Sequence, residues 1–262
     1  MHTIAIANQK GGCGKTTTAI NLSACLGLKG KKALLIDLDP QAHASIGVNS
    51  GEDSFPRTIY DALMNPRVDD NSLVNLAQPI VGNFDFIPSD STMLEAERQL
   101  ERMPRRHERL LLSLQEMANR FKDAYDYVVI DCPPSIGPLT ENAFFACDEA
   151  LLTIETSFFA LHGIARLLDF IQHLKDMRPQ PLQIRALATM YDQRKNLAKE
   201  VLQDIKAYFG DLHYETVIRV NVKLEEAASF GLPITEYSKR CAGYQDYMAL
   251  ADEVITASNN PQ

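Results

Sequence analysis

Long apolar stretches are absent from this chain of 262 residues. No run approaches the ~18 uncharged apolar residues that a membrane-spanning helix needs. The first residues, MHTIAIANQKGG, contain no basic region followed by a long apolar core, so we expect no secretory signal peptide. The polar end ITASNNPQ offers no basic amphipathic helix for a membrane surface. These absences predict a cytoplasmic protein that has no membrane partner.

Paired cysteines are absent too. The chain has five cysteines, an odd number, and no two of them form a CxxC pair. They are Cys13, Cys25, Cys132, Cys147 and Cys241. Structural disulfides and zinc sites need paired or closely spaced cysteines, so reduced thiols are the simpler interpretation.

The chain also lacks an excess of positive charge. Its 26 Lys and Arg residues are outnumbered by 34 Asp and Glu residues, which gives a formal net charge of −8. A protein with this balance must concentrate basic groups locally if it is to bind nucleic acid. Ten basic and eight acidic residues lie between Arg178 and Arg240, so that stretch carries +2 and the remainder −10. Many exposed helical faces look like this, and charge alone leaves DNA binding open.

Apolar residues make up 45% of the chain and charged residues 23%, as in globular proteins. Short apolar runs alternate with longer segments of helical spacing. The runs are nearly continuous, as in parallel strands covered on both faces. We therefore predict an α/β fold with a doubly wound, mostly parallel twisted sheet flanked by helices, in a single domain over 1–262. The expected strands are Thr3–Ala7, Ala33–Asp37, Phe84–Ile87, Tyr127–Asp131, Ala150–Ile154, Ile184–Thr189 and Glu215–Ile218.

Five segments have helical spacing: Thr16–Leu28, Thr92–Phe121, Gly163–Met177, Leu197–Phe209 and Tyr244–Ala257. We expect Gly30 to end the first helix and Pro104 to break the second one into two pieces. The polar segment Asn49–Gly82 predicts a loop with short helices at the edge of the sheet.

A glycine-rich loop follows the first strand and opens the first helix, which is the context that a phosphate-binding loop needs. Its residues are Lys10, Gly11, Gly12, Cys13, Gly14, Lys15, Thr16 and Thr17. The backbone N–H groups of such a loop can point at phosphate oxygens, and the helix N-terminus adds its positive dipole end. Lys15 supplies a cation for the β- and γ-phosphates, Thr16 a hydroxyl for Mg²⁺, and Thr17 a hydroxyl for the α-phosphate. The strict motif is missed because Gln9 stands where its first glycine belongs, and an ordinary glycine turn is the alternative.

Two further strands end in aspartates. LLIDLDPQ places Asp37 and Asp39 after the second strand, and YVVIDCPPS places Asp131 at the end of another. In parallel sheets the carboxyl ends of the strands line the ligand crevice. A carboxylate at Asp131 can hold Mg²⁺, usually through a bound water. Asp39 and Asp131 could instead cap a turn or the following helix.

The stretch KGGCGKTTTAINLS resembles the deviant Walker A motif of the ParA/MinD group of P-loop ATPases. Within that group the chain most resembles ParA/Soj-type partition ATPases, from Ile4 to about Ile255. The resemblance implies that ATP and Mg²⁺ bind and that ATP induces a sandwich homodimer. In that dimer Lys10 would contact the nucleotide of the other subunit and neutralise charge during phosphoryl transfer.

The run DLDPQ resembles the switch I of this family, which implies that Asp39 orients or activates the attacking water. Catalytic roles therefore fall to Lys10, Lys15 and Asp39. Adenine contacts are implied for the stretches that contain Met190 and Asn221. No guanine-reading NKxD motif occurs, so GTP specificity has no support. The family often continues with Gly-Asn where this chain has Ala42-His43, which leaves the role of His43 open.

The resemblance also implies non-specific DNA binding through basic residues in the C-terminal region. Arg194 in YDQRKNL matches a family position, with Lys195 beside it. The family stretch IPRNVRL corresponds to Ile218–Leu224, where Arg219 takes the place of the proline and Lys223 keeps the second basic position. We predict that Arg194, Lys195, Arg219 and Lys223 bind DNA. Two subunits would double the number of phosphate contacts.

The implied function is ATP-dependent segregation of chromosome or plasmid DNA, at the nucleoid, with a ParB-like centromere-binding protein that stimulates hydrolysis. Several alternatives remain: a ParA-like positioner of another cargo, such as a protein organelle or chemosensory cluster, or a MinD-like membrane-associated regulator. An iron–sulfur carrier would need paired cysteines, and Cys132 and Cys147 form no CxxC pair. A small-molecule ligase or kinase would need turnover that depends on a metabolite.

Overall fold

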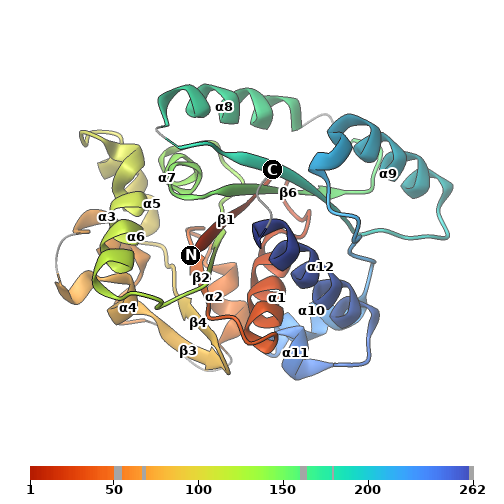
Figure 1. Ribbon diagram of the computed structural model, residues 1–262, viewed down its shortest axis with the longest axis horizontal. Helices are drawn as coiled ribbons and strands as arrows, with labels where there is room; N and C mark the ends of the chain where they lie inside the picture. The colour runs from red at the N-terminus through yellow and green to blue at the C-terminus, as the bar shows by residue number, and fades with distance from the viewer. Residues whose placement is uncertain (50–54, 67–68, 160–163, 179, 260–262) are drawn as a thin grey trace.

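The sheet has seven strands in the part of the chain that the structure, a computed structural model, describes: residues 1–49, 55–66, 69–159, 164–178 and 180–259. The strands lie in the order β3-β4-β2-β5-β1-β6-β7 (Figure 1). Their bounds are β1 His2–Ala7, β2 Ala33–Asp37, β3 Gln78–Val81, β4 Phe84–Ile87, β5 Tyr127–Asp131, β6 Glu149–Glu155 and β7 Gln183–Thr189. All neighbouring pairs are parallel except β3 with β4, which is antiparallel. The predicted doubly wound sheet is therefore confirmed.

One predicted strand is wrong. Glu215–Ile218 forms no strand: isolated bridges to the sheet lie on either side of it, at His213 and Arg219, and the N–H of Ile218 donates to the carbonyl of Ala188 at 2.9 Å. The backbone N–H groups of Glu215 and Thr216 each donate a 2.8 Å hydrogen bond to the carboxylate of Glu253. These donors are thus taken by a helix side chain and not by a neighbouring strand.

The structure contains one strand that was not predicted, β3, which lies within the segment expected to be a loop. It forms the edge of the sheet opposite β7. Pro79 lies in β3 and has no N–H to donate to a ladder. Such a residue is tolerated on an edge strand, which has a neighbour on one side only. Because proline disfavours strands in general, the sequence of this segment did not predict a strand.

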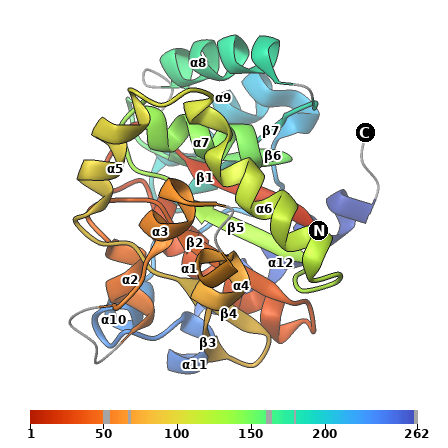
Figure 2. The same cartoon turned by 90° about the vertical axis from the view of Figure 1, so that its left-hand side faces the viewer.

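Helices cover both faces of the sheet (Figures 1 and 2). One face packs against α3 Ile59–Met64, α4 Leu73–Leu76, α5 Met93–Leu100, α6 Arg109–Arg120, α7 Pro138–Ala146, α8 Ile164–Met177 and α9 Asn196–Phe209. The other face packs against α1 Lys15–Leu28, α2 His43–Val48, α10 Val222–Ser229, α11 Ile234–Tyr237 and α12 Ala242–Asn259. Short 3₁₀ turns complete the chain at Asp69–Asn71, Arg106–Glu108 and Gly210–Leu212.

Alternate residues of the central strands serve the two cores. In β1, Ile4 and Ile6 belong to the core around α1 and α12, whereas Ala5 and Ala7 belong to the opposite one. This alternation is what a strand buried on both faces requires. It fixes which side chains of β1 face each core, and the carboxyl end of the strand leads directly into the glycine-rich loop.

The helix ends agree with the sequence. Gly30 has φ +79° and follows the last turn of α1, where its N–H bonds to the carbonyl of Gly27 at 3.0 Å. The segment around Pro104 separates α5 from α6, as predicted. The start expected for α8, Gly163, lies outside the described residues.

Candidate active site

The glycine-rich loop connects β1 to α1 at the carboxyl edge of the sheet. Gly12 and Gly14 have φ values of +73° and +85°, in the left-handed region that favours glycine. Gly14 is the N-cap of α1 and offers no side chain to cap it. The first N–H groups of the helix therefore face the loop, where they can bind an anion.

Three polar side chains that the sequence did not single out hold this loop. Thr189, the last residue of β7, donates a 2.8 Å hydrogen bond to the carbonyl of Cys13. The hydroxyl of Thr153 lies 3.3 Å from the Cys13 sulfur, and the Asn8 amide donates to the Thr153 carbonyl at 2.6 Å. The side-chain oxygen of Asn8 in turn accepts the N–H of Lys10 at 3.0 Å. Asn8 follows β1 and Thr189 ends β7, and these strand-end positions are the only signal in the sequence that could have suggested their role.

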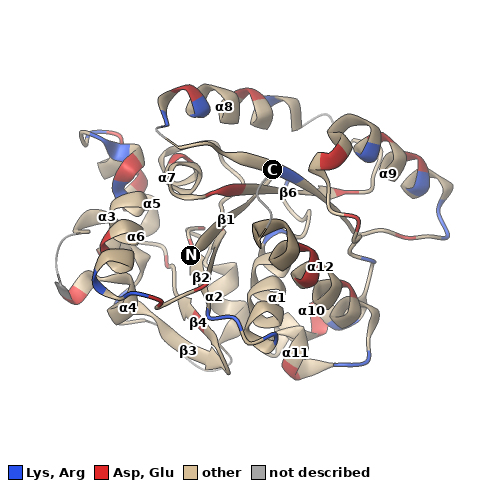
Figure 3. Cartoon of the chain, in the orientation of Figure 1, with Lys and Arg blue, Asp and Glu red and all other residues tan. Residues whose placement is uncertain are grey.

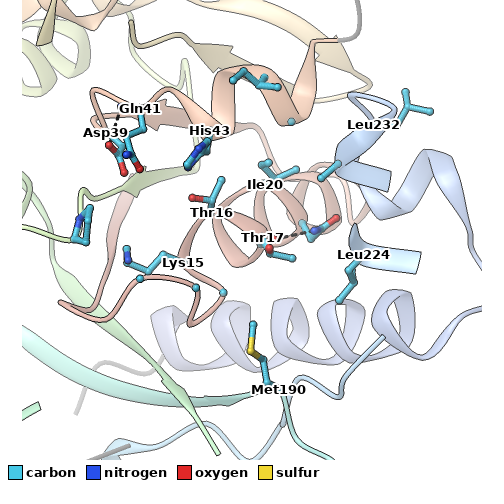
Figure 4. Close-up of a pocket in the computed structure, with 18 residues that line it drawn as sticks. Lys15, Thr16, Thr17, Ile20, Asp39, Gln41, His43, Met190, Leu224 and Leu232 are labelled. Atoms are coloured by element: carbon cyan, nitrogen blue, oxygen red, sulfur yellow. Dashed lines mark hydrogen bonds between the residues drawn. The ribbon is translucent and has the colours of Figure 1, made fainter. Parts of the chain in front are cut away.

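A cavity of about 510 Å³ opens beside the loop and α1 (Figure 4). It brings together most of the predicted nucleotide-binding residues: Gly11, Gly12, Gly14, Lys15, Thr16, Thr17 and Met190. Five apolar residues also line it: Ile20, Ile46, Leu224, Ala228 and Leu232. Cys13 does not line the cavity, because its fully buried side chain faces Thr153, and only its backbone can serve a ligand. Asn221 caps α10 by accepting the N–H of Lys223 and is also outside the cavity lining.

Thr16 and Asp131 form the candidate metal site. The Thr16 hydroxyl donates to Oδ2 of Asp131 at 2.7 Å. Oδ1 of Asp131 is buried and has no hydrogen-bond partner within the part of the chain that the structure describes. A hydroxyl and a carboxylate oxygen are hard donors of the type that Mg²⁺ prefers. The residues present therefore fit a magnesium ion, which Thr16 and Asp131 would hold.

Two buried carboxyls in this region, those of Asp37 and Asp131, have raised pKa values. Burial raises the pKa of Asp37 to about 7, although hydrogen bonds from Ser45 oppose the rise. Burial, followed by the charge of Asp37, raises the pKa of Asp131 well above its usual range. A divalent cation at Asp131 would favour its ionised form, because an opposite charge nearby lowers the pKa of a carboxyl.

Asp39 lines the same cavity and is 6% exposed. Its Oδ1 accepts the N–H of Gln41 at 2.9 Å, which closes a tight turn (Figure 4). Ala42 ends that turn with φ 54° and ψ 33°, a left-handed conformation that costs an alanine more than a glycine. His43 begins α2 and lines the cavity between this turn and Thr16 (Figure 4). Of the two residues that depart from the family pattern, His43 therefore lines the cavity and Ala42 lies in the adjoining turn.

The two lysines of the loop lie in different places. The Lys15 ammonium is nearly buried and donates to the carbonyl of Lys10 at 3.2 Å. Lys10 is not part of the cavity lining, and its side chain is 43% exposed. Its ammonium forms an ion pair with Glu155 and a 3.1 Å hydrogen bond to the Ser157 hydroxyl. Lys10 is therefore held at the end of β6, outside its own nucleotide cavity.

The four predicted DNA-binding residues lie on adjoining segments. Tyr191 and Arg219 pair as an isolated parallel bridge, which places the segment before α9 beside the segment before α10. Arg194 is 84% exposed, although Asp192 accepts two of its guanidinium hydrogen bonds at 2.9 and 3.0 Å. Lys195 is exposed at the start of α9. Figure 3 shows Lys and Arg interspersed with Asp and Glu along α8 and α9.

Arg219 and Lys223 are more constrained than the first two. Arg219 is bound by the carboxylate of Asp246, which accepts both its backbone N–H and its Nε at 3.0 Å. Lys223 bonds to Glu226 at 2.6 Å and lies over the ring of Tyr237. Both therefore have structural partners that a phosphate would have to replace or share.

Two absences bear on the alternatives. Among the described residues no helix is long and apolar enough to cross a membrane. The same residues contain no group of three or more His, Cys, Asp and Glu side chains arranged to hold a metal ion. All five cysteines are free, and four of them are buried.

Comparison with known proteins shows which family the chain is similar to. A family profile described as an AAA domain matches residues 1–184. The chromosome partitioning protein ParA of Caulobacter vibrioides is 41% identical over 263 residues, which cover 100% of this chain and 97% of that protein. The sporulation initiation inhibitor protein Soj of Bacillus subtilis is 41% identical over 253 residues, which cover 96% and 97%.

Solved structures agree on the fold. Cobyrinic acid a,c-diamide synthase of Mycobacterium smegmatis, solved with bound ADP and magnesium, has a TM-score of 0.81 at 26% identity and covers 100% of this chain and 96% of its own. McdA of Cyanothece in complex with ATP has a TM-score of 0.83 at 21% identity, with coverage of 100% and 98%.

The loop, the sheet order and the strand-end aspartates are those of a P-loop ATPase with a doubly wound sheet, which confirms the predicted fold class. Because its identity to ParA and Soj extends along the whole chain, the protein belongs to the ParA/Soj family of partition ATPases. The resemblance in the loop sequence predicted this family correctly.

Proposed function

We propose that this protein is an ATP-driven switch for DNA segregation, in which Mg²⁺-ATP is bound at the glycine-rich loop and hydrolysed there. Lys15 and the N–H groups of the loop bind the phosphates, Thr16 and Asp131 hold the metal, and Asp39 orients the attacking water. The bound ion would supply charge neutralisation on the phosphoryl oxygens. The similar diamide synthase was solved with ADP and magnesium, which supports this ligand pair.

The observation that carries the proposal is the separation of the two lysines. Lys15 lines the cavity, whereas Lys10 lies outside it and is 43% exposed. A lysine that is not needed for its own nucleotide is available for the nucleotide of a second copy. In the proposed dimer each Lys10 leaves Glu155 and neutralises the charge that builds on the transferred phosphoryl group of the other subunit. ATP then shifts the population from monomer to dimer.

The proposed dimer binds DNA without sequence preference. Supporting this, Arg194 and Lys195 are exposed on a segment that adjoins Arg219. Lys and Arg side chains that bind phosphates release counterions, so binding would weaken steeply with salt. Hydrolysis would dissolve the dimer and release the DNA, which makes the protein cytoplasmic and nucleoid-associated.

The proposed cargo is a chromosome or plasmid, carried by a ParB-like centromere-binding protein that stimulates hydrolysis. The identity of 41% to two relatives, one of them named for chromosome partitioning, favours this cargo over a protein organelle. It also favours partition over the activity for which the diamide synthase is named, since the identity to that protein is 26%.

Light scattering after gel filtration tests the switch with the Asp39→Ala variant, which should bind ATP without hydrolysing it. We expect a monomer with ADP, a dimer with ATP, and DNA cosedimentation of the dimer alone. Lys15→Ala is the matched control that should stay monomeric. An Asp39→Ala protein that remains monomeric at saturating ATP would overturn the dimer.

A further inference from the structure

Asp39 can orient a water only if its backbone is fixed, and two side chains from different parts of the chain hold it. Its N–H donates to Oδ1 of Asp37 at 3.0 Å. Its carbonyl accepts the hydroxyl of Ser89 at 2.7 Å. Ser89 is 50 positions away in the sequence, just beyond the end of β4. Both polar groups of the Asp39 backbone are therefore bound by side chains.

Ser45 closes this arrangement into a ring. Its hydroxyl donates to Oδ2 of Asp37 at 2.8 Å and accepts the N–H of Ser89 at 2.9 Å. The N–H of Ser45 donates to the same Asp37 oxygen at 3.0 Å. Ser45 belongs to α2, so the ring joins β2, the turn at Asp39, α2 and the segment after β4.

All four residues of the ring are buried, with exposures between 0% for Asp37 and 6% for Asp39. A buried polar network that satisfies its members stabilises one arrangement, because any displacement leaves a polar group unpaired. Among the residues that the structure describes, the Asp39 side chain forms a hydrogen bond only with the N–H of Gln41, and it faces the cavity (Figure 4). The ring thus fixes the backbone and leaves the carboxylate directed at the ligand.

We infer that Ser89 is a positioning residue for hydrolysis, which acts with Ser45 and Asp37 to set the carboxylate of Asp39 over the phosphate loop. The inference rests on the water-orienting role proposed for Asp39. Ser89 touches no ligand, because it is absent from the described cavity lining and its hydroxyl ends on the Asp39 carbonyl. Its loss should therefore slow hydrolysis and leave nucleotide binding intact.

The test compares the single-turnover rate of ATP hydrolysis with the dissociation constant for ATP. We expect Ser89→Ala to slow hydrolysis by at least about tenfold, since a catalytic group displaced by 1 Å can lose ~100-fold in rate. The ATP dissociation constant and the ATP-induced dimer should be unchanged. Ser89→Thr keeps the hydroxyl and should recover most of the rate.

Ser113→Ala is the matched control. Ser113 is a buried serine in α6 whose hydroxyl bonds to the carbonyls of Ala62 and Arg109 at 3.2 and 3.3 Å, away from the cavity. This variant should match the thermal destabilisation of Ser89→Ala without slowing hydrolysis. Equal rates in the two variants would overturn the inference.

Two further variants separate the possible failures. If Asp39→Ala still hydrolyses ATP, the role proposed for Asp39 is wrong whatever Ser89 does. If Asp39→Ala is inactive and Ser89→Ala is fully active, only the positioning role of Ser89 is wrong. Should Ser89→Ala not fold, Ser89→Cys takes its place, with nearly the same shape and a weaker donor, and a parental rate in that variant also overturns the inference.

Discussion

Thr16 and Asp131 are 115 positions apart in the sequence, yet the hydroxyl of one donates to the carboxylate of the other at 2.7 Å. The parallel pairing of β1 with β5 brings them together, because it places the loop after β1 beside the end of β5. Asp131 is fully buried, and its second oxygen has no hydrogen-bond partner among the described residues. A buried carboxylate with a free oxygen is expensive unless a cation or a proton compensates it.

Asp131→Asn should therefore remove the magnesium dependence of nucleotide binding. In the parental protein we expect Mg²⁺ to tighten ATP binding by about tenfold or more, a difference of ~1.4 kcal/mol. In the variant the affinity for ATP should be the same with Mg²⁺ and with EDTA. Titration with a fluorescent ATP analogue measures both. A variant that keeps the full magnesium effect would place the metal elsewhere.

Mixing two inactive variants tests whether Lys10 acts on the other subunit. Lys10→Ala retains its own nucleotide site and Asp39, whereas Asp39→Ala retains Lys10 and should still bind ATP and dimerise. If Lys10 acts across the dimer, equimolar mixing should restore part of the ATPase activity, because one composite site of the mixed dimer has both lysines and Asp39. Each variant alone is the control. Mixtures as inactive as their components would argue that Lys10 serves its own subunit.

The ion pair between Lys10 and Glu155 should oppose dimerisation, since Lys10 must leave it to reach another nucleotide. An exposed pair contributes about 0.2–1 kcal/mol and the dimer breaks two of them, so Glu155→Gln should tighten the ATP-bound dimer by about twofold to thirtyfold. Analytical ultracentrifugation with ATP measures this change. Glu116→Gln, which breaks a similar surface pair with Arg120 on α6, is the control. A weaker dimer would mean that Glu155 stabilises the dimer.

The glycine-rich loop could be predicted from the sequence because its signal is local. An apolar strand, two glycines that need positive φ and a helix follow one another between His2 and Leu28. The strand-end position of Asp131 was equally readable, since YVVID is a continuous apolar run that ends in a carboxylate.

The parts that could not be predicted depend on contacts between distant residues. No residue near Glu215 in the sequence indicates that its N–H donates a hydrogen bond to Glu253. In the same way Ser89 looks like an ordinary loop serine until β2 and β4 pair and bring it to Asp39. Long-range packing decides such contacts, and it overrides local propensity.

Neutral substitutions in the basic segments should reduce DNA affinity and its dependence on salt. Each phosphate contact contributes about 0.9 to the slope of log affinity against log salt, so a dimer that loses two contacts should lose ~1.8. We expect this for Arg194→Ala and Lys195→Ala, measured by fluorescence anisotropy at several salt concentrations. Lys122→Ala, an exposed lysine between α6 and β5, is the control. An unchanged slope in both variants would remove this segment from the DNA interface.

Arg219→Ala should behave differently because Asp246 binds this arginine through its backbone N–H and its guanidinium. Asp246 is nearly buried, so the variant leaves its carboxylate without a cation and should lower the thermal midpoint as well. Circular dichroism on heating measures the midpoint, and DNA binding is compared with the parent at a temperature where both proteins are folded.

Ala42→Gly should stabilise the protein, because Ala42 has φ 54° and ψ 33° at the end of the Asp39 turn. The left-handed conformation destabilises an L-residue by roughly 1–2 kcal/mol, and glycine avoids this strain. Glycine also makes the unfolded chain more flexible, which offsets about 0.4–1 kcal/mol of the gain. The free energy of unfolding should therefore rise by about 0.5–1 kcal/mol, as measured with urea. Ala44→Gly, inside α2 and fully buried, is the control and should lower it. If Ala42→Gly is destabilising instead, the turn does not adopt this conformation in solution.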